Sequence, residues 1–141
     1  MENIRIQRAE QADWPYLKEK LHKYMLDAVG ADWRKFFITK HNGKTVAFGR
    51  IIDHGDYFEI ASLGVDYYHR GKGAGSRLLS FLVEEAKRLD PQKAIYGVTH
   101  RPGFVEKAGF KEIANAPEAL EYKKSKCLDP SKIKIMKVGS S

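Results

Sequence analysis

Hydrophobic residues recur along the chain with two periods, and the change from one period to the other predicts the order of the elements. An every-second-residue pattern in NIRIQRA, near the amino end, predicts a first strand. We expect Asp13 to cap a helix that has Pro15 in its first turn. Helical spacing then joins Trp14, Leu17, Leu21, Tyr24, Met25 and Ala28, and VGADW ends the helix.

The next segment predicts three strands joined by tight turns. WRKFFITK and TVAFGRII flank Asn42-Gly43, a dipeptide typical of two-residue hairpin turns. DHGD is a second turn. The strand YFEIASLGV that follows is apolar on both faces, which predicts a place at the centre of the sheet.

The second half of the chain alternates helix and strand. Apolar residues from Leu78 to Leu89 follow the helical period until Pro91 ends it. AIYGVT predicts a buried strand, and RPGFVEKAGF predicts a helix of about two turns before a left-handed cap at Gly109. FKEI and KIKIMKV are the last strands. This order predicts an α/β fold, a mixed sheet with helices on both faces.

Length and composition are those of one domain, residues 1–141, with one core. No apolar run is long enough to span a membrane, so we expect no membrane partner. MENIRIQRAE has no apolar signal core, and the single cysteine, Cys127, fits a reducing compartment. We therefore expect a cytoplasmic protein, without a Cys-based metal site.

The net charge of +7 and the pI of about 9.4 indicate an anionic partner. The basic residues are scattered except for a lysine-rich end from Lys123 to Lys137. No helix-turn-helix or RNA-reading motif accompanies them, so we expect no nucleic-acid partner. Nucleic-acid binding through the lysine-rich end is an alternative, and it predicts affinity that falls steeply with salt.

The segment DYYHRGKGAGSRLL places three glycines directly before a predicted helix. The first turn of a helix has unpaired N–H groups, and glycine lets a phosphate approach them. Arg70, Lys72 and Arg77 add positive charge. Neither the P-loop pattern nor the Rossmann pattern fits, since Ser76 stands where a third Rossmann glycine would be. A tight turn without ligand is the alternative.

At this point the residues resemble a known family. Arg70-x-x-Gly73-x-Gly75 matches the [QR]-x-x-G-x-[GA] signature of the GNAT acetyltransferase superfamily. FVEKAGF is similar to the family's F-Y-E-K-x-G-F segment, and the order of elements agrees over nearly the whole chain. The resemblance implies a GNAT-like acyl-CoA N-acyltransferase fold of about six or seven strands, with acetyl-CoA as cosubstrate. It also allows a homodimer, since dimers are common in the family.

The resemblance also implies how coenzyme A would lie. Leu63 and Val65 would pair their backbone with the pantetheine arm, where the central strand splays from AIYGVT. Phe104 and Lys107 would flank the coenzyme. Backbone N–H groups would take the pyrophosphate beside Arg70, from Gly71, Lys72, Gly73, Ala74, Gly75 and Ser76.

Glu59 is the first candidate for the base that deprotonates the acceptor amine. Many relatives place a glutamate near this point of the central strand, and a carboxylate within an apolar strand is costly unless it is used or paired. Its structural alternative is pairing with a basic residue such as Arg50. By resemblance, the N–H of Val65 would polarise the thioester carbonyl.

The general acid is not evident. Val105 stands where many relatives have a tyrosine that protonates the leaving thiolate. The thiolate can also leave without a protein donor. Loop histidines such as His54 are interpreted as solvated. Substitute donors are Tyr67, Tyr68, Tyr122, Thr99 and Cys127.

We interpret the chain as an enzyme that moves an acetyl group from acetyl-CoA to a primary amine by direct attack. The acceptor, a small molecule or a protein amine, is not identified by the sequence. The segment from Ala119 to Val138 weakly resembles the tails of N-acetylglutamate-synthase-like members, which does not assign a substrate. A non-catalytic acyl-CoA-binding regulator that docks on a partner protein is the alternative.

Overall fold

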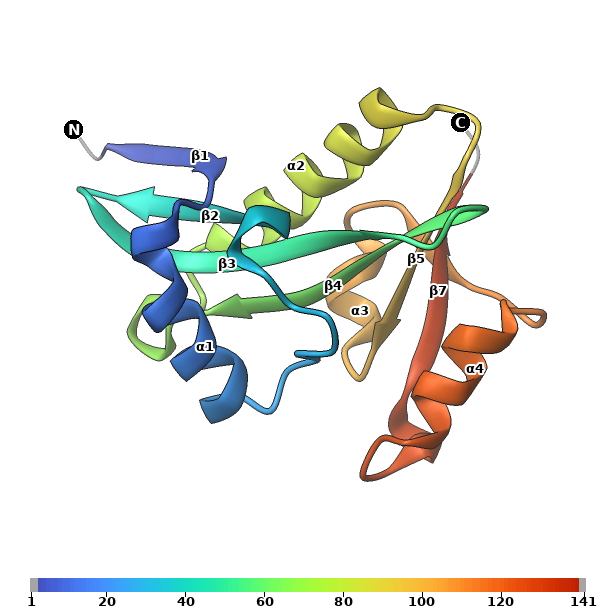
Figure 1. Ribbon diagram of the computed structural model, residues 1–141. Coiled ribbons are helices and arrows are strands. Elements are labelled where there is room, and N and C mark those ends of the chain that lie inside the picture. Colours follow the sequence, from blue (N-terminus) through green and yellow to red (C-terminus); the bar gives the residue numbers. More distant parts are fainter. Residues whose placement is uncertain (1–2, 140–141) are drawn as a thin grey trace.

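A single mixed sheet organises the computed structural model, which describes residues 3–139 (Figure 1). The sheet has seven strands in the order β1-β2-β3-β4-β5-β7-β6. They are β1 Ile4–Arg8, β2 Phe36–His41, β3 Lys44–Asp53, β4 Tyr57–Val65, β5 Ala94–Thr99, β6 Phe110–Glu112 and β7 Lys134–Val138. The α-helices in the described part are α1 Trp14–Lys23, α2 Ala74–Leu89, α3 Pro102–Glu106 and α4 Glu118–Ser125.

Helices cover both faces of this sheet. The apolar stripe of α2, from Leu78 to Ala86, packs with Val105 of α3 on one face. Leu17 and Leu21 of α1 pack on the other face against β2 and β3. Figure 1 shows α1 and α4 in front of the sheet and α2 behind it. The predicted α/β class, a mixed sheet with helices on both faces, is confirmed.

Local turn chemistry explains the pairing of β2 with β3. Asn42 and Gly43 both have positive φ, 51° and 82°, as a primed two-residue turn requires. β4 lies between β3 and β5, and the β4–β5 pair is parallel. The strand predicted to be central is therefore central.

The helices differ from the sequence prediction in three features. Asp13 stands at the N-cap position of α1, but its carboxylate makes no capping bond to this helix and accepts a hydrogen bond from the Glu10 N–H (2.7 Å) in a short 3₁₀ turn, Gln11–Asp13. The helix ends at Lys23, so Met25, with φ of 53°, and Ala28 lie in the following loop. The sequence pattern also did not predict α4. Among residues 3–139, no helix has the length and apolar character needed to cross a membrane.

Candidate active site

The glycine segment forms the entrance to α2. Gly71 and Gly73 have φ of 80° and 87°, a backbone conformation that favours glycine, and α2 begins directly afterwards at Ala74. Lys72 and Arg77 are exposed beside this helix start. Its free N–H groups and nearby positive charges make the segment able to hold an anion.

Arg70 fastens this segment to the central strand. Its Nε donates a hydrogen bond to the carbonyl oxygen of Val65 (3.0 Å). Its guanidinium lies over the Tyr24 ring, 4.7 Å from the centroid, and the Tyr24 hydroxyl accepts a hydrogen bond from the Tyr67 N–H (3.1 Å). The end of β4, the glycine segment and the end of α1 are thereby held together.

Gly75 is in the first turn of α2 at a point of close contact. A Cβ atom there would lie 3.0 Å from Val65 Cγ2 and 3.2 Å from Phe104 Cζ. The structure thus brings together three predicted cofactor-binding residues from β4, α2 and α3. Lys107 is exposed at the end of α3.

We expect Gly75→Val to weaken acetyl-CoA binding roughly tenfold or more, about 1.4 kcal/mol. The added side chain would displace Phe104 or Val65 while the backbone of α2 stays regular. Isothermal titration calorimetry with acetyl-CoA measures the effect. Ser76→Ala keeps its backbone N–H and should bind within about twofold of the wild type. Equal affinity of Gly75→Val and the wild type would mean that the coenzyme lies elsewhere.

β4 and β5 pair over only part of their lengths. Their register runs from Tyr57 opposite Ala94 to Ile60 opposite Gly97, although β4 continues to Val65. Ser62 has φ of 59°, and the register of β4 with β3 shifts beside it. Within residues 3–139, the edge of β4 that carries Leu63 and Val65 therefore has no strand paired to it beyond Ile60. This is the separation expected between these strands.

Glu59 is the next-to-last residue of β4 that pairs with β5, and its side chain is only 2% exposed. Its Oε1 lies 2.9 Å from Nε2 of His54, and its Oε2 accepts a hydrogen bond from the Lys123 ammonium group of α4. Glu59 forms ion pairs with Lys123 and His54, and not with Arg50, the structural partner expected from the sequence.

Arg50 is the centre of a second group of polar contacts. Its side chain is 1% exposed, and its Nε donates to Ser62 Oγ (2.9 Å). Its Nη2 donates to the carbonyl oxygen of Asp27 (3.2 Å), which also accepts from Ser62 Oγ (2.6 Å). These bonds hold the bulge of β4 against the loop after α1.

Asp27 joins the polar contacts around Glu59 to those around Arg50. Its Oδ2 accepts from Lys123 Nζ (2.7 Å) and lies 3.4 Å from Arg50 Nη2. Burial alone would raise the pKa of Asp27. The hydrogen bonds from Lys123 and the Val29 N–H, with the charges of Lys123 and Arg50, outweigh burial and hold this pKa below its ordinary value. Burial lowers the pKa of the Arg50 guanidinium, while Asp27 and Glu59 act in the opposite direction.

Sequence reasoning missed Asp27 and Lys123 and gave His54 little weight. Asp27 is in a loop, and Lys123 belongs to a lysine-rich stretch, so neither stands out by pattern. His54 stacks on Tyr57, with ring centroids 4.6 Å apart, and its ring contacts Glu59 while its side chain stays 26% exposed. Burial raises the pKa of Tyr57, and the negative charge of Glu59 adds to this effect.

The candidate proton donors are dispersed. Tyr67, Tyr68 and Tyr122 are largely exposed, and Val105 is buried in the core. The Thr99 hydroxyl accepts a hydrogen bond from the Arg101 N–H (2.9 Å). Cys127 Sγ lies 3.5 Å from the backbone carbonyl oxygen of Lys123, four residues earlier in the chain.

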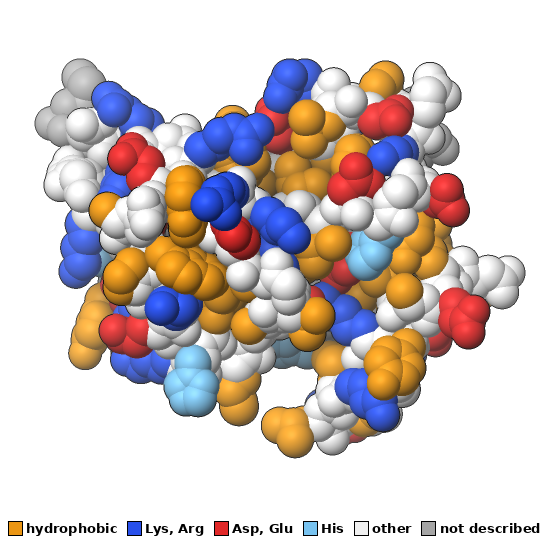
Figure 2. Space-filling model, in the orientation of Figure 1, with side chains coloured by type: hydrophobic (Ala, Val, Ile, Leu, Met, Phe, Trp, Pro, Cys, Tyr) orange, Lys and Arg blue, Asp and Glu red, His pale blue; other side chains and the backbone are white. Residues whose placement is uncertain are grey.

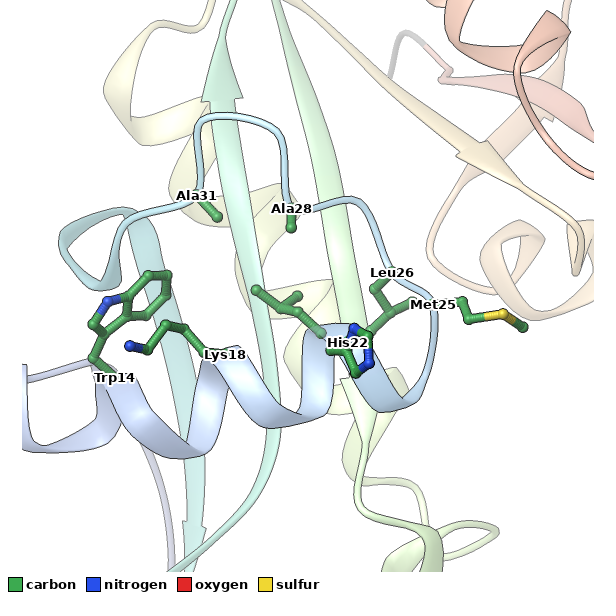
Figure 3. A pocket seen from close by; sticks show the side chains of 8 residues that line it. Trp14, Lys18, His22, Met25, Leu26, Ala28 and Ala31 are labelled. Atoms are coloured by element: carbon green, nitrogen blue, oxygen red, sulfur yellow. The ribbon is translucent and has the colours of Figure 1, made fainter.

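A separate cavity of about 570 Å³ lies between α1 and the loop that follows it (Figure 3). Trp14, Lys18 and His22 of α1 line one side, and Ala28 and Ala31 line the other. None of the predicted site residues lines this cavity. Within residues 3–139, no group of three or more His, Cys, Asp or Glu side chains is arranged to hold a metal ion.

Comparison with a family model identifies the region that carries Glu59 and the glycine segment. The model described as Acetyltransferase (GNAT) domain matches residues 32–112, more than half of the chain. The chain belongs to the GNAT acetyltransferase family. The matched region runs from β2 to β6 and includes the glycine segment, Glu59 and the separation of β4 from β5.

Solved structures share the fold of this GNAT domain. Rv2747 from Mycobacterium tuberculosis, in complex with CoA and NLQ, is 20% identical with a TM-score of 0.75, over 97% of this chain and 99% of that one. N-acetylglutamate synthase from Neisseria gonorrhoeae, complexed with coenzyme A and N-acetyl-glutamate, is 18% identical with a TM-score of 0.75. That match covers 98% of this chain but only 36% of the synthase.

Escherichia coli ElaA is 16% identical with a TM-score of 0.71, over 99% of this chain and all of its own. A comparison with curated protein sequences gave no match. At these identities the likeness shows the GNAT acyl-CoA N-acyltransferase fold and assigns no acceptor.

Proposed function

We propose that the protein is an N-acetyltransferase that moves the acetyl group of acetyl-CoA to a primary amine by direct attack. One observation carries the proposal: a buried carboxylate, Glu59, stands at the next-to-last residue of β4 that pairs with β5. The same strand end is fastened to the glycine segment through Arg70. The base and the free strand edge therefore both lie on β4, and the anion site lies in the segment that follows β4.

Each part has a role in this reaction. The N–H groups from Gly71 to Ser76 hold the pyrophosphate, and Leu63 and Val65 pair with the pantetheine arm. The Val65 N–H polarises the thioester carbonyl as negative charge develops on its oxygen. Glu59 accepts the proton of the acceptor amine, directly or through water. CoA-bound neighbours of the same fold support the use of acyl-CoA.

The leaving group requires no tyrosine in this proposal. Val105 is buried in the core, and a valine side chain has no proton to donate. The position where many relatives have a tyrosine therefore offers no proton donor here. A thiolate is a good enough leaving group to depart as the anion and take its proton from water. The alternative function, a non-catalytic acyl-CoA-binding regulator docked on a partner protein, is favoured by Val105 and by the complete pairing of Glu59.

Release of free thiol from acetyl-CoA tests the proposal. Purified protein is incubated with pooled amines, namely amino acids, polyamines, aminoglycosides and lysine peptides. We expect release above the acceptor-free rate in at least one pool, which also gives the acceptor class. Tight acetyl-CoA binding with no release from any pool would contradict the enzyme and favour the regulator.

A further inference from the structure

Lys123 holds together three segments that are distant in sequence. It comes from α4, and its ammonium group contacts Glu59 of β4 and Asp27 of the loop after α1. Figure 1 shows α1 and α4 on the same side of the sheet, and Figure 2 shows the surface indented between them. A primary ammonium group is thus seated between two carboxylates on the face where Glu59 lies.

The charges around this ammonium group are balanced. Arg50 and Lys123 are positive, Asp27 and Glu59 are negative, and each makes an ion pair within the set. A second ammonium group entering beside Lys123 would leave an uncompensated positive charge in a partly buried site, which is costly. An ammonium group that takes the place of Lys123 keeps the balance.

The proposed reaction requires an amine at the same carboxylate. If Glu59 is the base, the acceptor amine must come within hydrogen-bond distance of one of its oxygens. His54 Nε2 lies at Oε1, and the Lys123 ammonium group is at Oε2. The position at Oε2 is therefore the one that the acceptor needs.

We propose that Lys123 occupies the acceptor's ammonium subsite, formed by Asp27 and Glu59, and competes with the acceptor for it. This inference rests on the proposed function. The subsite recognises a primary alkylammonium group, because the seated group donates to two carboxylates, Oδ2 of Asp27 and Oε2 of Glu59. Acceptor binding moves the Lys123 side chain into solvent.

Displacement of Lys123 is structurally easy. Its side chain is already 27% exposed and is long and flexible, while Leu120 is the residue of α4 that is buried and anchors it. Asp27 keeps its contact with Arg50, and Glu59 keeps its contact with His54. The His54 side chain is 26% exposed, so a proton that Glu59 takes from the amine has a route to solvent through Oε1.

The experiment replaces the lysine and supplies its ammonium group as a separate molecule. Lys123→Ala is titrated with n-propylammonium and followed by thermal shift and by NMR of the His54 ring. We expect saturable binding at least about tenfold tighter than in the wild type, where Lys123 competes. The neighbouring variant Lys124→Ala should behave as the wild type, and Asp27→Asn in the Lys123→Ala background should abolish the gain.

Two outcomes would overturn the subsite: folded Lys123→Ala that binds n-propylammonium no better than the wild type, or a gain that survives Asp27→Asn. If Lys123→Ala does not fold, Lys123→Met keeps the stem of the side chain as far as the atom in the place of Cε, and it is titrated with the ammonium ion under the same criteria. Product formation is read separately by adding acetyl-CoA. Binding without N-acetylpropylamine would support the subsite and contradict the proposed transfer reaction.

Discussion

Glu59→Gln is expected to lower the rate of acetyl transfer by about 10²- to 10⁴-fold, the usual contribution of a positioned general base. The amide has the shape of the carboxylate and can still accept a hydrogen bond, but it cannot take the proton of the acceptor amine. Affinity for acetyl-CoA should stay unchanged, because the pyrophosphate and pantetheine contacts are assigned to the glycine segment and to the backbone of β4. Single-turnover transfer and calorimetry measure the two quantities separately.

The matched control is Glu84→Gln on α2. Glu84 is 74% exposed and makes a surface ion pair with Lys87 (3.6 Å), so its amide should leave rate, affinity and stability nearly unchanged. A full transfer rate in Glu59→Gln would show that Glu59 is only a structural partner of Lys123 and His54. A loss of acetyl-CoA affinity equal to the loss of rate would instead indicate a damaged fold.

Much of the fold could be predicted because the pattern along the chain is locally consistent. The Asn42-Gly43 turn, the apolar run of β4 and the helical stripe of α2 each agree with the structure around them. α4 was missed because its packing leaves little trace in sequence: Leu120 is its buried residue, and the rest of EALEYKKS is mostly polar. The end of α1 was missed because Met25 continues the apolar spacing although its backbone has left the helix.

The candidate site was predictable only where a residue departs from its local pattern. Glu59 is conspicuous as a charge within an apolar strand, and the glycines are conspicuous before a helix. Asp27 and Lys123 are 96 residues apart, and Lys123 and Glu59 are 64 apart, in segments with no pattern in common. Their meeting depends on how α4 and the loop after α1 lie on one face of the sheet, which no local signal specifies.

Arg50→Met is expected to lower the free energy of unfolding by about 3–5 kcal/mol, which is a large fraction of the total for a domain of this size. The Arg50 side chain is 1% exposed and supports both Ser62 and Asp27. Loss of the guanidinium removes a positive charge that is paired with Asp27. It also leaves the Ser62 hydroxyl without its hydrogen-bond donor, at a residue whose φ of 59° already carries strain. Denaturation in urea measures the change.

Arg34 provides the comparison for this prediction, because it also pairs with an aspartate but at the surface. The Arg34 side chain is 70% exposed and lies 2.9 Å from Asp32, so Arg34→Met should cost less than about 1 kcal/mol. Arg50→Lys keeps the charge but loses the geometry of the guanidinium, and an intermediate loss is expected. If Arg50→Met were as stable as the wild type, packing would hold the bulge of β4 without the charge. Because that bulge precedes the free edge of β4, a stability loss in Arg50→Met should also weaken acetyl-CoA binding, whereas Arg34→Met should leave it unchanged.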